Sequence, residues 1–154
     1  MSVYHQAKGS IVLKLVIALL AGVLLWVLYE PYQIREQEDH FRRESRVRMQ
    51  NIRSAQLKHI ELRGTYSRSI SELLEFVKAG LASDTLNAAI FKPLTSGTFV
   101  PESLLYSPKT WKLWELSVMD TTTIKKWYVE DPNGYGSIGT LSDDSKVNKA
   151  SWEE

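Results

Sequence analysis

The strongest pattern in the chain is an unbroken run of apolar residues near its N-terminus. Residues 11–29 are apolar except for one charge, Lys14. A bilayer core about 30 Å thick requires about 20 apolar residues in a helix that rises 1.5 Å per residue. The run therefore predicts one membrane-spanning helix, since no other part of so short a chain has enough apolar surface to enclose it.

The residues within and at the ends of this run favour a retained anchor over a cleaved signal peptide. Lys14 lies one turn inside the span, from where its side chain can reach the headgroups. Trp26 and Tyr29 occupy the other boundary, where amphipathic rings are enriched. Signal peptides have shorter apolar regions that end in small residues. Ala18 and Gly22 are small and four residues apart, which permits close approach of a second helix.

The segment after Pro31 predicts a second, long helix. Residues 33–63 contain no Gly or Pro and are rich in Arg, Gln and Glu, which favour helices. A narrow apolar stripe at helical spacing indicates packing on one side or a continuation of the anchor. The stripe consists of Ile34, Phe41, Met49, Ile52, Gln56 and Ile60. Gly64 is expected to end this helix, since glycine tolerates the left-handed conformation.

A capping box predicts that a shorter helix starts at Ser69. In the pattern Ser69-Ile-Ser-Glu72, the hydroxyl and the carboxylate can each accept a hydrogen bond from a backbone N–H at the helix start. Apolar residues follow at i, i+3, i+4 and i+7 spacing, at Ile70, Leu73, Leu74 and Val77. Gly80 is expected to close the helix.

The C-terminal half predicts a small β-region. Residues 111–118 and 124–129 are aromatic and β-branched runs that predict two antiparallel strands. The sequence Asp131-Pro-Asn-Gly favours a turn. Residues 142–154 are polar and are expected to form a flexible tail.

The predicted fold class is therefore α+β, with the helices first. Its parts are an N-terminal flank (1–10), a transmembrane helix (11–29), a juxtamembrane helix (30–63), a small α+β domain (64–141) and the tail (142–154).

The charges are balanced overall but unevenly placed. The net charge is +1, yet all eight arginines lie between Arg35 and Arg68. A basic helix beside a membrane can face a partner protein, anionic lipid or nucleic acid. Acidic residues open the helix and few aromatics are interleaved, so a partner-facing helix is favoured over nucleic-acid binding. The residues expected to face the partner are Arg42, Arg43, Arg46, Arg48 and Arg53.

No constellation of residues predicts catalysis, a cofactor or a strong metal site. Cysteine is absent, and His5, His40 and His59 are scattered, which favours positions on a helix surface. A weak Ca²⁺ candidate is formed by Asp131, Asn133, Asp143 and Asp144, although turn formation alone explains the Asp-Pro-Asn-Gly sequence. A ligand pocket would require Trp111, Trp114, Trp127 and Tyr128 to converge, whereas the simpler interpretation is a sheet core.

The layout resembles that of type IV pilins and type II secretion pseudopilins. An apolar N-terminal helix runs into a basic helix that ends in Gly64-x-Tyr66, and Lys8-Gly9 stands where a prepilin peptidase would cut. Pilins carry a glutamate five residues after that glycine, whereas this chain has Lys14, which argues against standard pilin assembly.

A second resemblance is closer in sequence. Ile52-Arg-x-Ala-Gln56, Phe76-Val-Lys78 and the C-terminal Val147-Asn-x-Ala…Trp152-Glu resemble an uncharacterised family of single-pass membrane proteins from Bacteroidetes. This resemblance implies a cell-envelope location with the folded domain outside the cytoplasm.

The function expected from the sequence is that of a structural or assembly subunit in the inner membrane. The chain would span the bilayer once, place its C-terminal domain in the periplasm and bind other envelope membrane proteins. The alternatives are a membrane-tethered enzyme or ligand-binding module, and a cytoplasm-facing anchor that binds lipid or nucleic acid. The flanking charges do not decide the orientation.

Overall fold

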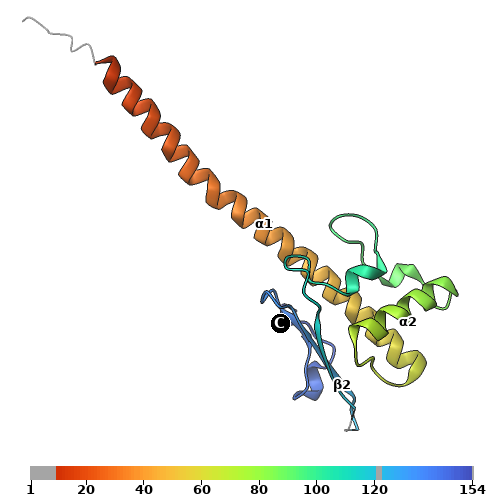
Figure 1. The fold of residues 1–154 in the computed structure, drawn as a ribbon. Helices are drawn as coiled ribbons and strands as arrows, with labels where there is room; N and C mark the ends of the chain where they lie inside the picture. The colour runs from red at the N-terminus through yellow and green to blue at the C-terminus, as the bar shows by residue number, and fades with distance from the viewer. Residues whose placement is uncertain (1–9, 121–122, 154) are drawn as a thin grey trace, which may run out of the picture. The chain divides into compact units, whose positions relative to one another are not determined.

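The computed structural model of the chain describes residues 10–120 and 123–153. Its helices and strands are α1 (Ile11–Arg63), α2 (Ile70–Ala82), β1 (Glu115–Met119), β2 (Lys126–Glu130) and β3 (Ser137–Gly139), with short 3₁₀ helices η1 (Ala88–Ile90), η2 (Pro101–Leu104) and η3 (Asp144–Lys146) (Figure 1). The predicted α+β class is confirmed. His5 and the Lys8-Gly9 pair lie outside the described residues.

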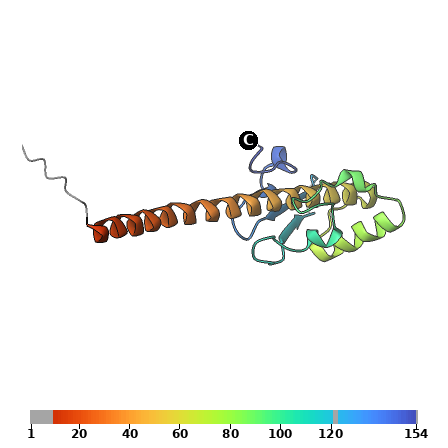
Figure 2. The same ribbon diagram turned by 90° about the horizontal axis from the view of Figure 1, so that it is seen from above.

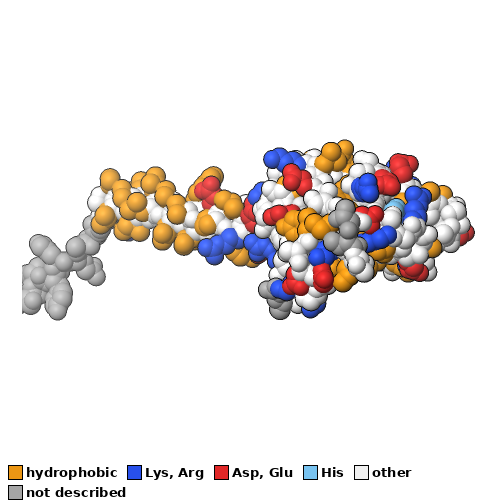
Figure 3. All heavy atoms as spheres, turned by 90° about the horizontal axis from the view of Figure 1, so that it is seen from below, with side chains coloured by type: hydrophobic (Ala, Val, Ile, Leu, Met, Phe, Trp, Pro, Cys, Tyr) orange, Lys and Arg blue, Asp and Glu red, His pale blue; other side chains and the backbone are white. Residues whose placement is uncertain are grey.

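The chain divides into two compact units between Asp39 and His40. The first unit contains the N-terminal part of α1, over which hydrophobic side chains gather (Figure 3). Among the described residues, α1 is the one helix long and apolar enough to cross a membrane, which is compatible with a single-pass membrane protein. Pro31 lies inside this helix.

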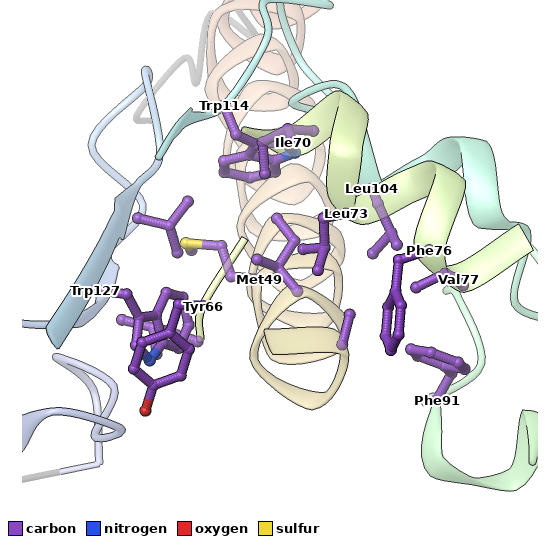
Figure 4. Close-up of a cluster of buried hydrophobic side chains, with 14 of the residues drawn as sticks. Met49, Tyr66, Ile70, Leu73, Phe76, Val77, Phe91, Leu104, Trp114 and Trp127 are labelled. Carbon is purple, nitrogen blue, oxygen red and sulfur yellow. The ribbon is translucent and has the colours of Figure 1, made fainter. Parts of the chain in front are cut away.

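The second unit folds around residues 40–63 of α1. The sheet lies on one side of this helix and α2 on the other (Figures 1 and 2). Met49 and Ile52 of α1 are fully buried, and the close-up shows Trp127 on one side of Met49 and Leu73 on the other (Figure 4). Burial of these large apolar side chains is the main stabilising term for the unit, at about 1.5–3 kcal/mol each.

The predicted end of α1 is confirmed, whereas the predicted end of α2 is not. α1 ends at Arg63 as predicted, because Gly64 adopts φ +76° and its N–H bonds the carbonyl of Ile60 at 2.8 Å. The prediction that Gly80 closes α2 is wrong. α2 continues to Ala82, and Gly80 lies buried inside it against the side chain of Leu86.

The start of α2 follows the predicted capping pattern. The Ser69 hydroxyl accepts a hydrogen bond from the N–H of Glu72 at 3.1 Å. The Glu72 carboxylate accepts from the N–H of Arg68 at 3.2 Å and from the hydroxyl of Ser67 at 3.0 Å. The carboxylate therefore reaches residues ahead of the cap rather than the N–H of Ser69 itself.

The sheet is antiparallel in the order β1-β2-β3. The predicted pairing of two strands is confirmed, but β1 begins at Glu115 and not at Trp111. β3 follows the turn at 131–136 and was not predicted, since it is only three residues long. Trp127, Val129 and Ile138 point into the core, where each is fully buried.

The prediction of a flexible tail at 142–154 is wrong for its described part. Val147 and Ala150 are buried in the core, and Ala150 pairs with Ile138 at the outer edge of β3. Gly139 donates its N–H to the carbonyl of Lys149 at 3.0 Å. The sequence did not predict this contact, because Val147 and Ala150 are small and the residues around them are polar.

Candidate interaction surface

The face of α1 that enters the second unit is partly polar. Glu44, Ser45, Asn51, Gln56 and His59 are all buried. Of these five residues only Gln56 belonged to the predicted stripe, because a polar side chain gives no hydrophobic signal even when the fold buries it. Buried polar groups require hydrogen-bond partners, and each of these side chains has one.

The two buried amides fasten loops to α1 through paired hydrogen bonds. Asn51 donates to the carbonyl of Lys92 at 3.0 Å and accepts from its N–H at 2.7 Å. Gln56 makes the same pair of bonds with Ser67, both at 2.9 Å. Each amide therefore replaces one peptide unit of a strand ladder, which fixes the backbone of its loop.

His59 is also buried, contrary to the expectation that the histidines lie on a helix surface. Its Nδ1 lies 2.6 Å from the carbonyl of Thr65, and its ring packs edge-on against Phe76 with centroids 4.8 Å apart. Since a carbonyl can only accept, Nδ1 is the donor. His59 is thus a structural residue of the loop after α1.

Glu44 is a buried acidic residue of α1, only 3% exposed. Burial raises the pKa of its carboxyl, while hydrogen bonds from Thr95 and Arg48 lower it and prevail, so the pKa lies below its ordinary value. Arg48 bonds Glu44 at 2.9 Å and also donates to the carbonyl of Tyr106 at 2.9 Å.

Three of the five arginines predicted to face a partner make contacts within the second unit. Arg48 binds Glu44 and Tyr106, as above. Arg46 donates to the carbonyl of Tyr135 at 3.3 Å and lies 5.0 Å from the ring centroid of Trp152. Arg53 bonds the carbonyl of Asn148 and the carboxylate of Glu153. Arg42 and Arg43 are exposed.

These arginine contacts hold the loops of the second unit on α1. One hairpin, formed by residues 106–113, has its tip in solvent. Tyr106 and Leu113 pair as an antiparallel bridge, and Ser107 donates its N–H to the carbonyl of Lys112 at 2.9 Å. The base of the hairpin is fixed twice more, by Arg48 on Tyr106 and by the Asn133 amide, which donates to the Ser107 hydroxyl at 2.7 Å.

Trp111 stands at the tip of this hairpin in an unusual conformation. Its φ is +54°, in the left-handed region that costs a non-glycine residue about 1–2 kcal/mol. Its side chain is 68% exposed, although its ring lies 6.2 Å from that of Tyr106. A bulky residue in this region is an outlier that the surrounding structure must impose. The strand predicted for residues 111–118 starts only at Glu115, and the indole of Trp111 is in solvent.

A groove opens beside this hairpin. It has a volume of about 430 Å³ and is lined by Lys112, Leu113, Glu115, Glu130, Asp131, Pro132 and Gly134. Leu113 is 55% exposed and forms an apolar wall. Glu115 and Glu130 are exposed and lie directly opposite each other in the register of β1 and β2. We call Trp111, Leu113 and this groove the hairpin surface.

The weak Ca²⁺ candidate is divided among other contacts. Asp131 is buried, accepts from the Ser45 hydroxyl and caps its own turn through the N–H of Asn133 at 2.6 Å. Asp143 caps η3 by accepting hydrogen bonds from the N–H and the hydroxyl of Ser145. These hydrogen bonds lower the pKa of the Asp143 carboxyl and outweigh the small opposing effect of burial. Asp144 pairs with Lys126. No group of three or more His, Asp or Glu residues suited to a metal ion occurs within 10–120 and 123–153.

The four aromatic residues considered for a ligand pocket do not converge. Trp114 and Trp127 are in the core, as the simpler interpretation expected, whereas Trp111 is exposed. Tyr128 is half-buried on the outer face of the sheet and donates to the Glu130 carboxylate at 2.8 Å. Burial and this neighbouring carboxylate raise the pKa of the Tyr128 hydroxyl.

The fold and the hairpin surface define a class of protein: an α+β domain joined to a helix that can span a membrane, with a strained aromatic hairpin in solvent. Comparison of the chain with protein-family models, curated proteins and solved structures finds no match.

Proposed function

We propose that the protein is a single-pass subunit of a cell-envelope complex and that the hairpin surface binds another protein of that complex. The observation that carries the proposal is Trp111, whose indole is 68% exposed at a left-handed backbone position. Exposure of a large apolar ring and backbone strain both cost folding free energy. Binding of a partner offsets such a cost, since Trp is enriched among the residues that dominate interface energies.

The way in which the hairpin is held supports the same proposal. Its base is fixed to α1 by Arg48 and to the next turn by Asn133. A side chain presented on a rigid scaffold loses little conformational entropy on binding, and this increases the affinity obtained from a given contact. Leu113 extends the apolar area next to Trp111.

The location is part of the proposal. The span at residues 11–29 would lie in the inner membrane, with the second unit in the periplasm. A reporter active only in the periplasm and a reporter active only in the cytoplasm, each fused after Glu154, test this orientation. We expect activity from the periplasmic reporter alone. Activity from the cytoplasmic reporter alone contradicts the proposed orientation.

Partner binding is tested with a photoreactive amino acid at Thr110, which is exposed beside Trp111. The full-length chain in native membranes is irradiated, and adducts are identified by mass spectrometry. We expect a discrete protein adduct whose yield falls at least fivefold in Trp111→Ala. Val100→Ala is the matched control, because Val100 is also an exposed apolar residue, 46% exposed, outside the hairpin surface. Adducts to lipid alone, or a yield that Trp111→Ala leaves unchanged, contradict the proposal.

A further inference from the structure

We infer that the hairpin surface recognises a basic segment of its partner, with an arginine side chain seated in the groove between Leu113 and the carboxylates of Glu115 and Glu130. This inference rests on the proposed function and adds the chemistry of the partner. The groove combines an apolar wall with mainly negative charges, and these two features together specify the occupant.

The residues that line the groove carry an excess of negative charge. Three of its lining residues are acidic, Glu115, Glu130 and Asp131, and one is basic, Lys112. Asp131 is 2% exposed and is held by Ser45 and by the N–H of Asn133, so its carboxylate is fixed in the wall. An excess of negative charge in a concave surface attracts a cationic group and disfavours an acidic one.

The groove also has two like charges at opposed positions of the sheet. Glu115 and Glu130 are direct cross-strand partners on the exposed face of the sheet. Like charges at directly opposed positions destabilise a sheet. Among the ion pairs of the described residues, none neutralises either carboxylate: the basic side chains bonded to acids there pair with other residues. A cation placed between the two carboxylates would convert the repulsion into attraction.

Among cations, the guanidinium group of arginine fits the groove best. A guanidinium group is planar, donates in parallel to two carboxylate oxygens and stacks on aromatic rings. Leu113 lines the groove together with Glu115 and Glu130, and the exposed Trp111 precedes Leu113 by two residues in the same hairpin. An arginine on a segment that also carries an apolar side chain therefore matches the surface better than a free metal ion or an acidic peptide.

The experiment uses the full-length chain in native membranes with the photoreactive residue at Thr110, so that Trp111 is retained. Adduct yield is compared between the unaltered groove and the double variant Glu115→Gln/Glu130→Gln. The matched control is Glu36→Gln/Glu75→Gln, which removes two exposed carboxylates outside the groove. The melting temperature of each purified variant is measured in detergent.

We expect the groove variant to lose at least fivefold in adduct yield, while its melting temperature stays unchanged or rises by about 2 °C as the like-charge contact is removed. The control variant should keep the original yield. The cross-linked peptide of the partner should contain an arginine or lysine, and the yield should fall as salt is raised.

Other outcomes separate this inference from the proposed function. A protein adduct that depends on Trp111 but not on Glu115 and Glu130, or one formed with an acidic segment, overturns the inference and leaves the proposed function intact. Adducts to lipid alone overturn both. A lower melting temperature of the groove variant, together with lower yield, overturns the inference because the carboxylates would then act on the fold.

Discussion

Gln56 and Ser67 face each other through two reciprocal hydrogen bonds, both 2.9 Å long and both buried. The side-chain amide of Gln56 takes the place of a neighbouring strand for the backbone of Ser67. The sequence between them contains the end of α1 and the turn at Gly64, so these two bonds determine how the chain reverses into α2.

Replacing Gln56 by leucine is expected to lower the free energy of unfolding by about 2–4 kcal/mol, because the N–H and carbonyl of Ser67 lose their partners while they stay buried. Urea unfolding of the full chain in detergent, followed by tryptophan fluorescence, measures the change. Gln37→Leu is the control, since Gln37 is exposed on the same helix. Equal effects of the two substitutions would show that the buried amide bonds do not stabilise the turn.

Gly80→Ala tests whether local propensity or packing governs α2. Helix propensity alone predicts a gain of about 1 kcal/mol. A Cβ at Gly80, however, would lie 2.5 Å from Cγ and Cδ1 of Leu86. We expect a net loss of about 1–3 kcal/mol from this overlap, measured by thermal unfolding.

A double-mutant cycle with Leu86→Ala isolates the cause of that loss. In the Leu86→Ala background Cγ and Cδ1 are removed and the nearest remaining atom of residue 86 is Cβ, at 3.2 Å, so Gly80→Ala should lose most of its destabilising effect. Persistence of the loss in that background would locate its origin elsewhere than at Leu86.

The pH dependence of stability should contain a contribution from Glu44. Hydrogen bonds from Thr95 and Arg48 overcome the effect of burial and hold the pKa of this carboxyl below its ordinary value. A carboxyl with a lowered pKa stabilises the fold above the pKa of the unfolded chain, about 4.3 for Glu. That stabilisation is lost as the pH falls through the lower pKa of the folded state.

Glu44→Gln should therefore flatten the loss of unfolding free energy between about pH 5 and pH 3. Denaturant titrations at several pH values measure the slope. Glu36→Gln is the control because Glu36 is exposed, and it should retain the original slope. A Glu44→Gln variant with an unaltered slope would assign the acid sensitivity to other carboxylates.

The strain at Trp111 is tested by comparing two substitutions that both remove the ring. At φ +54° a glycine residue is unstrained, whereas an alanine residue is strained. Trp111→Gly should therefore be more stable than Trp111→Ala by about 1 kcal/mol, as measured by thermal unfolding. The same pair of substitutions at Thr110 should show the opposite order, since glycine loses more backbone entropy on folding.

Several elements follow directly from the sequence because their signals are local. The apolar run at 11–29 indicates a membrane-spanning helix, and Gly64 ends α1 where a left-handed residue is required. The Ser69 cap and the pairing of β1 with β2 depend on residues near one another in the chain. Local hydrogen-bond patterns and periodicity are sufficient to predict such elements.

The roles of the polar residues were decided only by the tertiary structure. The arginines of α1 suggested a surface for partners, yet Arg46 and Arg53 bond residues that follow them by 89 and 95–100 positions. Whether a side chain faces solvent or fastens a loop depends on which distant segment lies next to it, and no local pattern records this. The same reason applies to the burial of Glu44 and to the packing of Gly80 against Leu86.

Local patterns were thus sufficient for a helix long and apolar enough to cross a membrane, for the two helix boundaries at Gly64 and Ser69 and for the α+β class, since each follows from periodicity, length or backbone chemistry. The tertiary structure alone decided that Trp111 leaves the predicted strand and stands in solvent. Hydrogen bonds to Ser107 and Tyr106 fix the base of its hairpin, and they come from Asn133 and Arg48, on other elements of the fold.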